Sequence, residues 1–221
     1  MKPMDNQRGI GIAEAPIPLW SPAVMSEPVS IQSGVLPEHR GAAARLYWQA
    51  FGQKLSFVMG PDRRALAYLD RVMRSDHVIT ATSVHGTLLA IAGFRTASSG
   101  FTAGGMGDLV AVYGPIGARW RAILLWLLSS DADARQMLVD GIVVVEPMRN
   151  CGLGSAMIDA LCREARERGY DEIRLDVANV NPRARALYER SGFAAVGIDR
   201  IGPLAPLFRY SSSTRMVRKL A

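Results

Sequence analysis

Apolar residues recur at helical spacing in the first part of the chain. Between residues 36 and 55 they fall three or four positions apart, which predicts an amphipathic helix. Gly60 and Pro61 interrupt the pattern, because proline cannot continue a helix. The same spacing returns over residues 62–74 and predicts a second helix, while residues 29–33 before them predict a short strand.

Other apolar runs have the short length and the composition of strands. Residues 77–84 and 88–96 predict a strand pair joined at the turn signal His85-Gly86. Residues 137–145 form a nearly continuous apolar run, as expected for a strand whose two faces are both covered.

Helices and strands alternate in the last third of the chain. Residues 153–168 predict an amphipathic helix that ends at Gly169, since glycine accepts the left-handed position after a helix. The remaining predicted elements are a strand at 172–178, a helix at 182–190 behind the capping pair Asn181-Pro182, and strands at 193–198 and 215–220. This order predicts an α/β (α+β) fold with one mixed central sheet flanked by helices.

Two segments fit this scheme poorly. Residues 1–28 are proline-rich and predict a flexible N-terminal arm, so we expect the folded domain to cover residues 29–221. Residues 98–135 look like an insertion, glycine-rich at first and then strongly apolar over 120–128, where a short helix is predicted. Three roles stay open for that helix: a buried layer over the sheet, a lid or wall beside a substrate site, or a homodimer contact.

The composition narrows the class of protein. The 221 residues are 49% hydrophobic and 21% charged, which is typical of a soluble globular protein. The formal net charge of +6 favours anionic partners. Because the basic residues are scattered and rarely interleaved with aromatic ones, nucleic acid is not the expected partner, and the charge can also belong to an ordinary solvated surface.

Compartment and metal content can also be predicted. No apolar run approaches the roughly 20 residues of a membrane span, and no signal peptide is visible, so no membrane partner is expected. Cys151 and Cys162 lie too far apart along one predicted helix for a disulfide, and free thiols suit the cytoplasm. The three histidines, His39, His77 and His85, lack metal-ligand spacing, and no metal is expected.

The stretch RNCGLGSA, residues 149–156, links a predicted strand to a predicted helix. It lacks the lysine of a Walker loop, and Met157 stands where a dinucleotide fingerprint needs its third glycine. The pattern R-x-x-G-x-G remains, formed by Arg149, Gly152 and Gly154. The free N–H groups at a helix start attract anions, so the loop is either a phosphate site or a plain strand-to-helix connection.

A second block, NPRARALYERSGF at residues 181–193, decides between these two alternatives. Together the two blocks resemble the GNAT superfamily of N-acetyltransferases, in which the first binds the pyrophosphate of acetyl-coenzyme A (acetyl-CoA). The resemblance is close over residues 137–220 and implies a single GNAT-like domain. It also implies direct transfer of an acetyl or acyl group from acetyl-CoA, the cosubstrate, to a primary amine of a small molecule, peptide or protein.

The resemblance also implies roles for particular residues. The implied acetyl-CoA site comprises Val143, Val144, Val145, Arg149, Asn150, Cys151, Gly152, Leu153, Gly154 and Ser155, with Asn181 and Tyr188 from the second block. The main chains of Val144 and Val145 match the positions that stabilise the developing oxyanion, and Tyr188 matches a general acid. Asp140 is the first candidate for the general base and Glu146 the second, with a water chain as the alternative.

Two other functions compete with this one. A GNAT fold could hold acyl-CoA as a non-catalytic sensor or interaction module, and a basic chain could bind nucleic acid. The amine acceptor itself matches no motif. We expect its site to be built from residues 36–74, 98–135 and 199–214, where the sequence carries no recognisable pattern.

Overall fold

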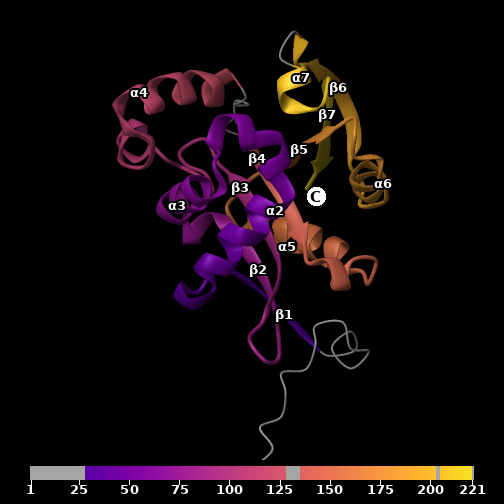
Figure 1. Ribbon diagram of the computed structural model, residues 1–221. Coiled ribbons are helices and arrows are strands. Elements are labelled where there is room, and N and C mark those ends of the chain that lie inside the picture. Colours follow the sequence, from indigo (N-terminus) through magenta and orange to yellow (C-terminus); the bar gives the residue numbers. More distant parts are fainter. Residues whose placement is uncertain (1–27, 128–134, 203–204, 221) are drawn as a thin grey trace, which may run out of the picture.

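The computed structural model describes residues 28–127, 135–202 and 205–220. Its seven strands form one sheet in the order β1-β2-β3-β4-β5-β7-β6 (Figure 1). They are β1 (Val29–Ser33), β2 (Val78–Ser83), β3 (Leu88–Arg95), β4 (Gln136–Val144), β5 (Glu172–Ala178), β6 (Ala194–Arg200) and β7 (Ser212–Lys219). Strands β4 and β5 run parallel and the other neighbours antiparallel, so the predicted mixed sheet is confirmed.

Helices flank the sheet as predicted. They are α2 (Arg40–Met59), α3 (Asp62–Val72), α4 (Met106–Leu127), α5 (Leu153–Glu167), α6 (Pro182–Arg190) and α7 (Ala205–Phe208), with single 3₁₀ turns at η1 (Pro37–His39), η2 (Ser75–His77) and η3 (Glu146–Met148). Helix α2 starts and ends four residues later than predicted, at the Gly60-Pro61 break. Strand β7 starts three residues before its predicted position, and the short α7 has no counterpart among the predicted elements.

The sheet separates two hydrophobic cores. One lies under α2, α3 and α4, and the other lies under α5. Strand β5 shows the division, because Ile173, Leu175 and Val177 belong to the α5 core. Side chains alternate along a strand, so Arg174 and Asp176 face the α2 side.

Helix α4 is longer than the short helix predicted at 120–128. It begins at Met106 and bends at Gly114-Pro115, where Gly114 has a φ of 72°. Ile116 and Trp126 are 83% and 73% exposed, whereas Leu109, Tyr113 and Ala118 are buried in the core under α2, α3 and α4, so this helix buries one face and exposes the other. Within the helix Arg121 stacks on the rings of Tyr113 and Trp120, 4.1 Å from each ring centroid, and it links α4 to the end of α2 by donating from Nη2 to the carbonyl of Gly60 over 3.4 Å.

Some predictions concern residues outside the described ranges. The arm at 1–28, apart from Pro28, and the end of the insertion at 128–134 are among them. In the described part of the chain both cysteines are free thiols, as predicted. Cys151 is exposed and Cys162 is buried. No described helix combines the length and apolarity that crossing a membrane requires.

Candidate active site

Strands β4 and β5 separate along their length. They pair from Gln136 and Glu172 only as far as Val139 and Leu175. Strand β4 carries an extra residue at Asp140 relative to β3, which is a β-bulge, and then continues along β3 to Val144. We call the resulting opening between the carboxyl ends of β4 and β5 the split.

The glycine loop lies at the carboxyl end of β4, beside the split. Its chain takes left-handed conformations at Asn150 (φ 66°) and at Gly152 (φ 81°), immediately before α5 begins at Leu153. A side chain at Gly152 would meet no atom within 4 Å, so the surface there is open. No side chain caps α5, and its first N–H groups are therefore available to an anion.

The loop and the second sequence block lie together in space. Arg183 of α6 donates from Nη2 to Asn150 Oδ1 over 3.0 Å. Gly154 lets the two helices approach, because a Cβ there would lie 3.2 Å from Leu187 Cδ2. Arg149 donates from Nε to the carbonyl of Val144 over 3.2 Å, which brings its charge to the mouth of the split.

The predicted loop residues differ in what they can offer a ligand. The side chains of Val143 and Leu153 are buried in the two cores, so only their main chains are accessible to a cosubstrate. Cys151 and Ser155 are exposed. The Cys151 thiol points back to the carbonyl of Arg149, 3.6 Å away.

The main chain of β4 directs one predicted N–H group into the split. The N–H of Val145 donates to the carbonyl of Leu89 in β3 over 2.9 Å. Consecutive N–H groups of a strand point to opposite edges, so that of Val144 points toward β5, beyond the last paired residues. Of the two predicted donors, Val144 therefore faces the split and Val145 is engaged in the sheet.

Helix α6 supplies the two predicted residues of the second block. Asn181 caps it, since its Oδ1 accepts from the N–H of Ala184 over 3.1 Å, and the predicted cap is confirmed. Tyr188 is partly buried, with its ring centroid 5.9 Å from that of Phe193. Burial raises the pKa of Tyr188 to about 12, so the phenol keeps its proton at neutral pH.

Asp140 lies at the bulge of β4 and is 6% exposed. Its Oδ1 accepts from Nη2 of Arg95 over 2.8 Å, while its Oδ2 is buried without a hydrogen-bond partner in the described part of the chain. Burial raises the pKa of Asp140, and the charge of Arg95 offsets part of that effect. Glu146, the second predicted base, is exposed in the turn η3.

A cleft of about 1210 Å³ adjoins Asp140 on the side of the sheet that faces α2. We call it the α2-side cleft. It is lined by residues of α2, α3, α4 and five strands, among them Tyr47, Lys54, Tyr68, Arg95, Leu125, Asp140, Arg174, Asp176, Asp199, Arg200, Tyr210 and Arg215. Leu125 places α4 at its wall, in line with one of the roles left open for that helix.

Sequence reasoning named none of the polar residues of this cleft individually as site residues except Asp140, although Lys54 and Tyr210 lie in two of the ranges, 36–74 and 199–214, that were expected to build the acceptor site. Lys54 lies on α2, Arg215 in β7 and Tyr210 between α7 and β7, and the three stand in no shared motif. Only the alternation of charged Arg174 and Asp176 with apolar neighbours in β5 gave a local signal. The fold brings these side chains together, and their spacing in the sequence gives no sign that they meet.

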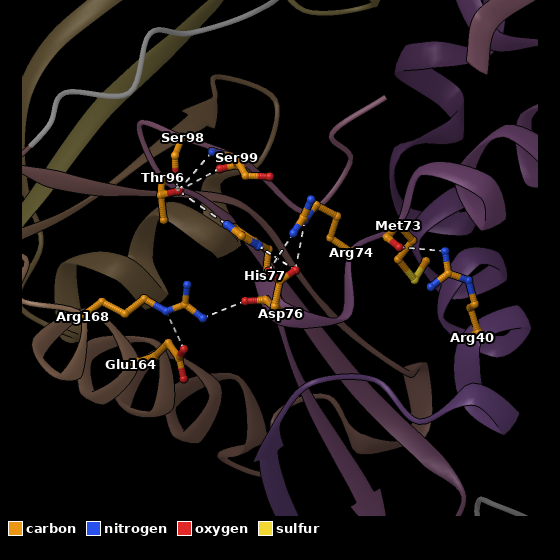
Figure 2. A network of polar contacts seen from close by, with 10 residues as sticks. All are labelled: Arg40, Met73, Arg74, Asp76, His77, Thr96, Ser98, Ser99, Glu164 and Arg168. Carbon is orange, nitrogen blue, oxygen red and sulfur yellow. Dashed lines mark hydrogen bonds and ion pairs between the residues drawn. The ribbon is translucent and has the colours of Figure 1, made fainter. Parts of the chain in front are cut away.

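A network of polar contacts surrounds the buried His77 and Thr96 (Figure 2). His77 lies between Asp76 and Thr96, with Nδ1 3.0 Å from Asp76 Oδ1 and Nε2 3.4 Å from Thr96 Oγ1. Thr96 Oγ1 also accepts from the N–H of Ser99 over 3.2 Å, and residues 96–100 line the cleft. Arg168, just after α5, donates to the carbonyl of Asp76 over 2.7 Å, so the network joins this part of the cleft lining to α5 across the molecule.

Comparison with known proteins agrees with the geometry. The family described as Acetyltransferase (GNAT) family matches residues 42–193. The mycothiol acetyltransferase of Beutenbergia cavernae is 41% identical over 75 residues, which are 34% of this chain and 24% of that protein. The "Probable N-acetyltransferase camello" of Xenopus tropicalis is 31% identical over 86 residues, 39% of this chain and 38% of that protein. The matches thus span between about a quarter and two fifths of these relatives.

Solved structures share the fold. An N-acetyltransferase from Staphylococcus aureus Mu50 superposes with a TM-score of 0.59 at 14% identity, over 85% of this chain and 99% of that one. The ribosomal-protein-S18-alanine N-acetyltransferase of Escherichia coli gives 0.50 at 16% identity, over 88% and 95%. At these identities the likeness concerns the fold alone.

Proposed function

Because the chain belongs to the Acetyltransferase (GNAT) family, we propose that it transfers an acetyl or acyl group from acetyl-CoA directly to a primary amine of a small molecule, peptide or protein. The observation that carries this proposal is the position of the glycine loop and the uncapped start of α5 beside the split of β4 and β5. A donor bound at the loop can pass its thioester into the split, toward the α2-side cleft.

The loop suits a pyrophosphate in shape and in charge. Gly152 leaves open space where any other residue would place a Cβ, and the first turn of α5 carries no acidic residue. Arg149 adds a permanent positive charge. We assign Asn150, Cys151, Gly152, Leu153, Gly154 and Ser155 to phosphate contacts, mainly through their main chains, and Val143, Val144, Asn181 and Tyr188 to the pantetheine arm and thioester.

Three groups can perform the acyl transfer. Asp140 accepts a proton from the acceptor ammonium, and the free amine attacks the thioester carbonyl to form a C–N bond. The N–H of Val144 stabilises the charge that develops on the carbonyl oxygen. As the C–S bond breaks, Tyr188 donates its phenolic proton to the leaving sulfur, and the proton that the new amide nitrogen loses passes through solvent to the phenolate.

Their surroundings fit these roles. Burial raises the pKa of the Asp140 carboxyl, which makes its carboxylate a stronger base. The high pKa of Tyr188 keeps its proton in place until the thiolate forms. The free thiols of Cys151 and Cys162 favour a reducing compartment, and we propose a cytoplasmic location.

Thiol release tests the proposed function. The full chain is incubated with acetyl-CoA and a panel of amino acids, peptides, polyamines and amino sugars. Free CoASH is measured with a thiol reagent, and acetylated products are identified by mass spectrometry. Calorimetry measures acetyl-CoA binding in parallel. We expect binding together with amine-dependent thiol release; binding without release for any amine would instead favour a sensor or interaction module.

A further inference from the structure

The α2-side cleft carries an excess of positive charge. Its lining includes five basic side chains, Lys54, Arg95, Arg174, Arg200 and Arg215, against three aspartates, Asp140, Asp176 and Asp199. A cleft of about 1210 Å³ is large enough for a small acceptor together with the end of a pantetheine arm. The charge of the lining therefore bears on which amines can enter.

Each aspartate of the cleft is matched with an arginine. Asp140 pairs with Arg95 at 2.8 Å. The other two pairs are Arg174 with Asp176 at 3.0 Å and Arg215 with Asp199 at 2.8 Å. These pairs neutralise one another, and the excess positive charge falls on the two remaining basic residues.

Of these two, Lys54 is the one held inside. Arg200 is exposed, whereas Lys54 is half-buried on α2, with its Nζ 5.2 Å from the centroid of the Tyr210 ring. Across the described ranges, no carboxylate forms an ion pair with Lys54. Burial lowers the pKa of Lys54, because its charge has lost water without gaining an anion.

The position of Lys54 on α2 also indicates how far it lies from Asp140 along the cleft. Tyr47, seven residues earlier on α2, lines the same cleft and lies near enough to Asp140 for that carboxylate to raise the pKa of its phenol further. Seven residues of helix correspond to about 10 Å along its axis. Lys54 and Asp140 therefore mark two ends of the cleft and not one point within it.

We propose that the acceptor is an amine that also carries a carboxylate or phosphate several bonds away from the nitrogen, with the anion bound by Lys54 beside Tyr210 and the amine placed at Asp140. This inference rests on the proposed function and specifies its substrate class. An α-amino acid is too short to reach both ends, and a diamine would place a second cation against Lys54.

Matched acceptors test the proposal. 6-Aminohexanoate is compared with its neutral amide, 6-aminohexyl phosphate with 6-aminohexan-1-ol, and both pairs with glycine and 1,6-diaminohexane. An ion pair to a charged group is worth about tenfold or more in kcat/KM, so we expect at least one anionic compound to exceed its neutral partner by that factor. The pair that shows the larger ratio distinguishes carboxylate from phosphate.

Substitution of Lys54 is the second part of the test. Lys54→Met should remove the preference for the anionic compound while changing kcat/KM for its neutral partner by less than about twofold. Lys54→Glu should turn the preference toward 1,6-diaminohexane. Lys219→Met, which removes a lysine near the end of β7 that does not line the cleft, should keep the wild-type preference. Unchanged acetyl-CoA affinity in each variant verifies its fold.

The results separate two kinds of failure. Faster transfer to neutral amines or diamines by the wild-type protein would overturn this inference alone, and so would a preference that survives Lys54→Met. Absence of thiol release with every amine would overturn the proposed function, and this inference with it.

Discussion

The donor side and the acceptor side of the split are built in different ways. In the proposed function most of the donor side is one continuous stretch, from Val144 to Ser155, which would act mainly through main-chain conformation and N–H groups, while α6 adds Asn181 and Tyr188. The α2-side cleft collects side chains from α2, α3, α4 and five strands, and holds most of its charges in ion pairs. A main-chain site needs particular residues at fixed spacing, whereas a side-chain site needs only that the fold bring its members together.

The largest effect is expected from the acceptor side, at Asp140. Replacing Asp140 by Asn keeps the shape of the side chain but removes the proton acceptor. General base catalysis contributes about 10²–10⁴-fold, so kcat/KM should fall by about 10³-fold. Steady-state thiol release measures this loss, and calorimetry should find acetyl-CoA affinity unchanged.

The pH profile distinguishes a base from a structural carboxylate. The carboxylate form is the active one, and burial raises the pKa of Asp140. Activity of the wild-type protein should therefore fall as pH drops through a value above the usual range for aspartate. Asp140→Asn should lose that acidic limb, and Glu146→Gln should keep both the limb and the rate. A limb that persists in Asp140→Asn would assign the base to another group or to water.

The next largest effect concerns Tyr188, on the donor side. Tyr188→Phe removes the proton donor for the leaving sulfur and should lower kcat by about 10²-fold. Because the pKa of Tyr188 is raised to about 12, the wild-type protein should show no loss from tyrosine ionisation between pH 7 and 10. Thiol-release assays between pH 7 and 10 measure both the kcat of Tyr188→Phe and the pH dependence of the wild-type rate.

Tyr170→Phe is the matched control, since Tyr170 follows the far end of α5, away from the split. It should leave kcat unchanged. Equal turnover in Tyr188→Phe and wild type would remove Tyr188 from the acid role and leave it a packing residue beside Phe193.

The difference between the two sides also explains what could be predicted from the sequence. The strands and most helices follow from apolar spacing, because burying one face imposes a period on the chain. The donor loop was predicted because Arg149, Gly152 and Gly154 must stand in order. Lys54 and Tyr210 were not, since nothing local links α2 to the chain before β7. The role of helix α4 stayed open, because an exposed apolar face has the same composition as a buried one.

A smaller effect is expected from the conformation of the donor loop. Gly152→Val places a β-branched residue at a φ of 81° and fills the open surface beside the start of α5. The left-handed conformation costs about 1–2 kcal/mol for such a residue. Acetyl-CoA affinity, measured by calorimetry, should fall by about tenfold or more, as a pyrophosphate can no longer approach the N–H groups.

Gly197→Ala is the control for that experiment. Gly197, in β6, has ordinary φ and open space where a Cβ would stand. Its affinity for acetyl-CoA should match that of the wild type. If Gly152→Val also binds acetyl-CoA normally, the loop is a plain connection and the pyrophosphate site lies elsewhere.

The smallest effect is expected at Asn181, where two roles can be separated. Asn181→Ala removes the acceptor for the Ala184 N–H and should lower the free energy of unfolding by about 1 kcal/mol, measured by chemical denaturation. Asn181→Asp keeps a capping oxygen but loses the amide N–H. If Asn181 only caps α6, the aspartate should restore both stability and acetyl-CoA affinity. If its amide also donates to the pantetheine arm, stability should return while affinity stays reduced. The second result would show that even this exposed helix start belongs to the donor side, where the chain binds its ligand through groups that the sequence places in order.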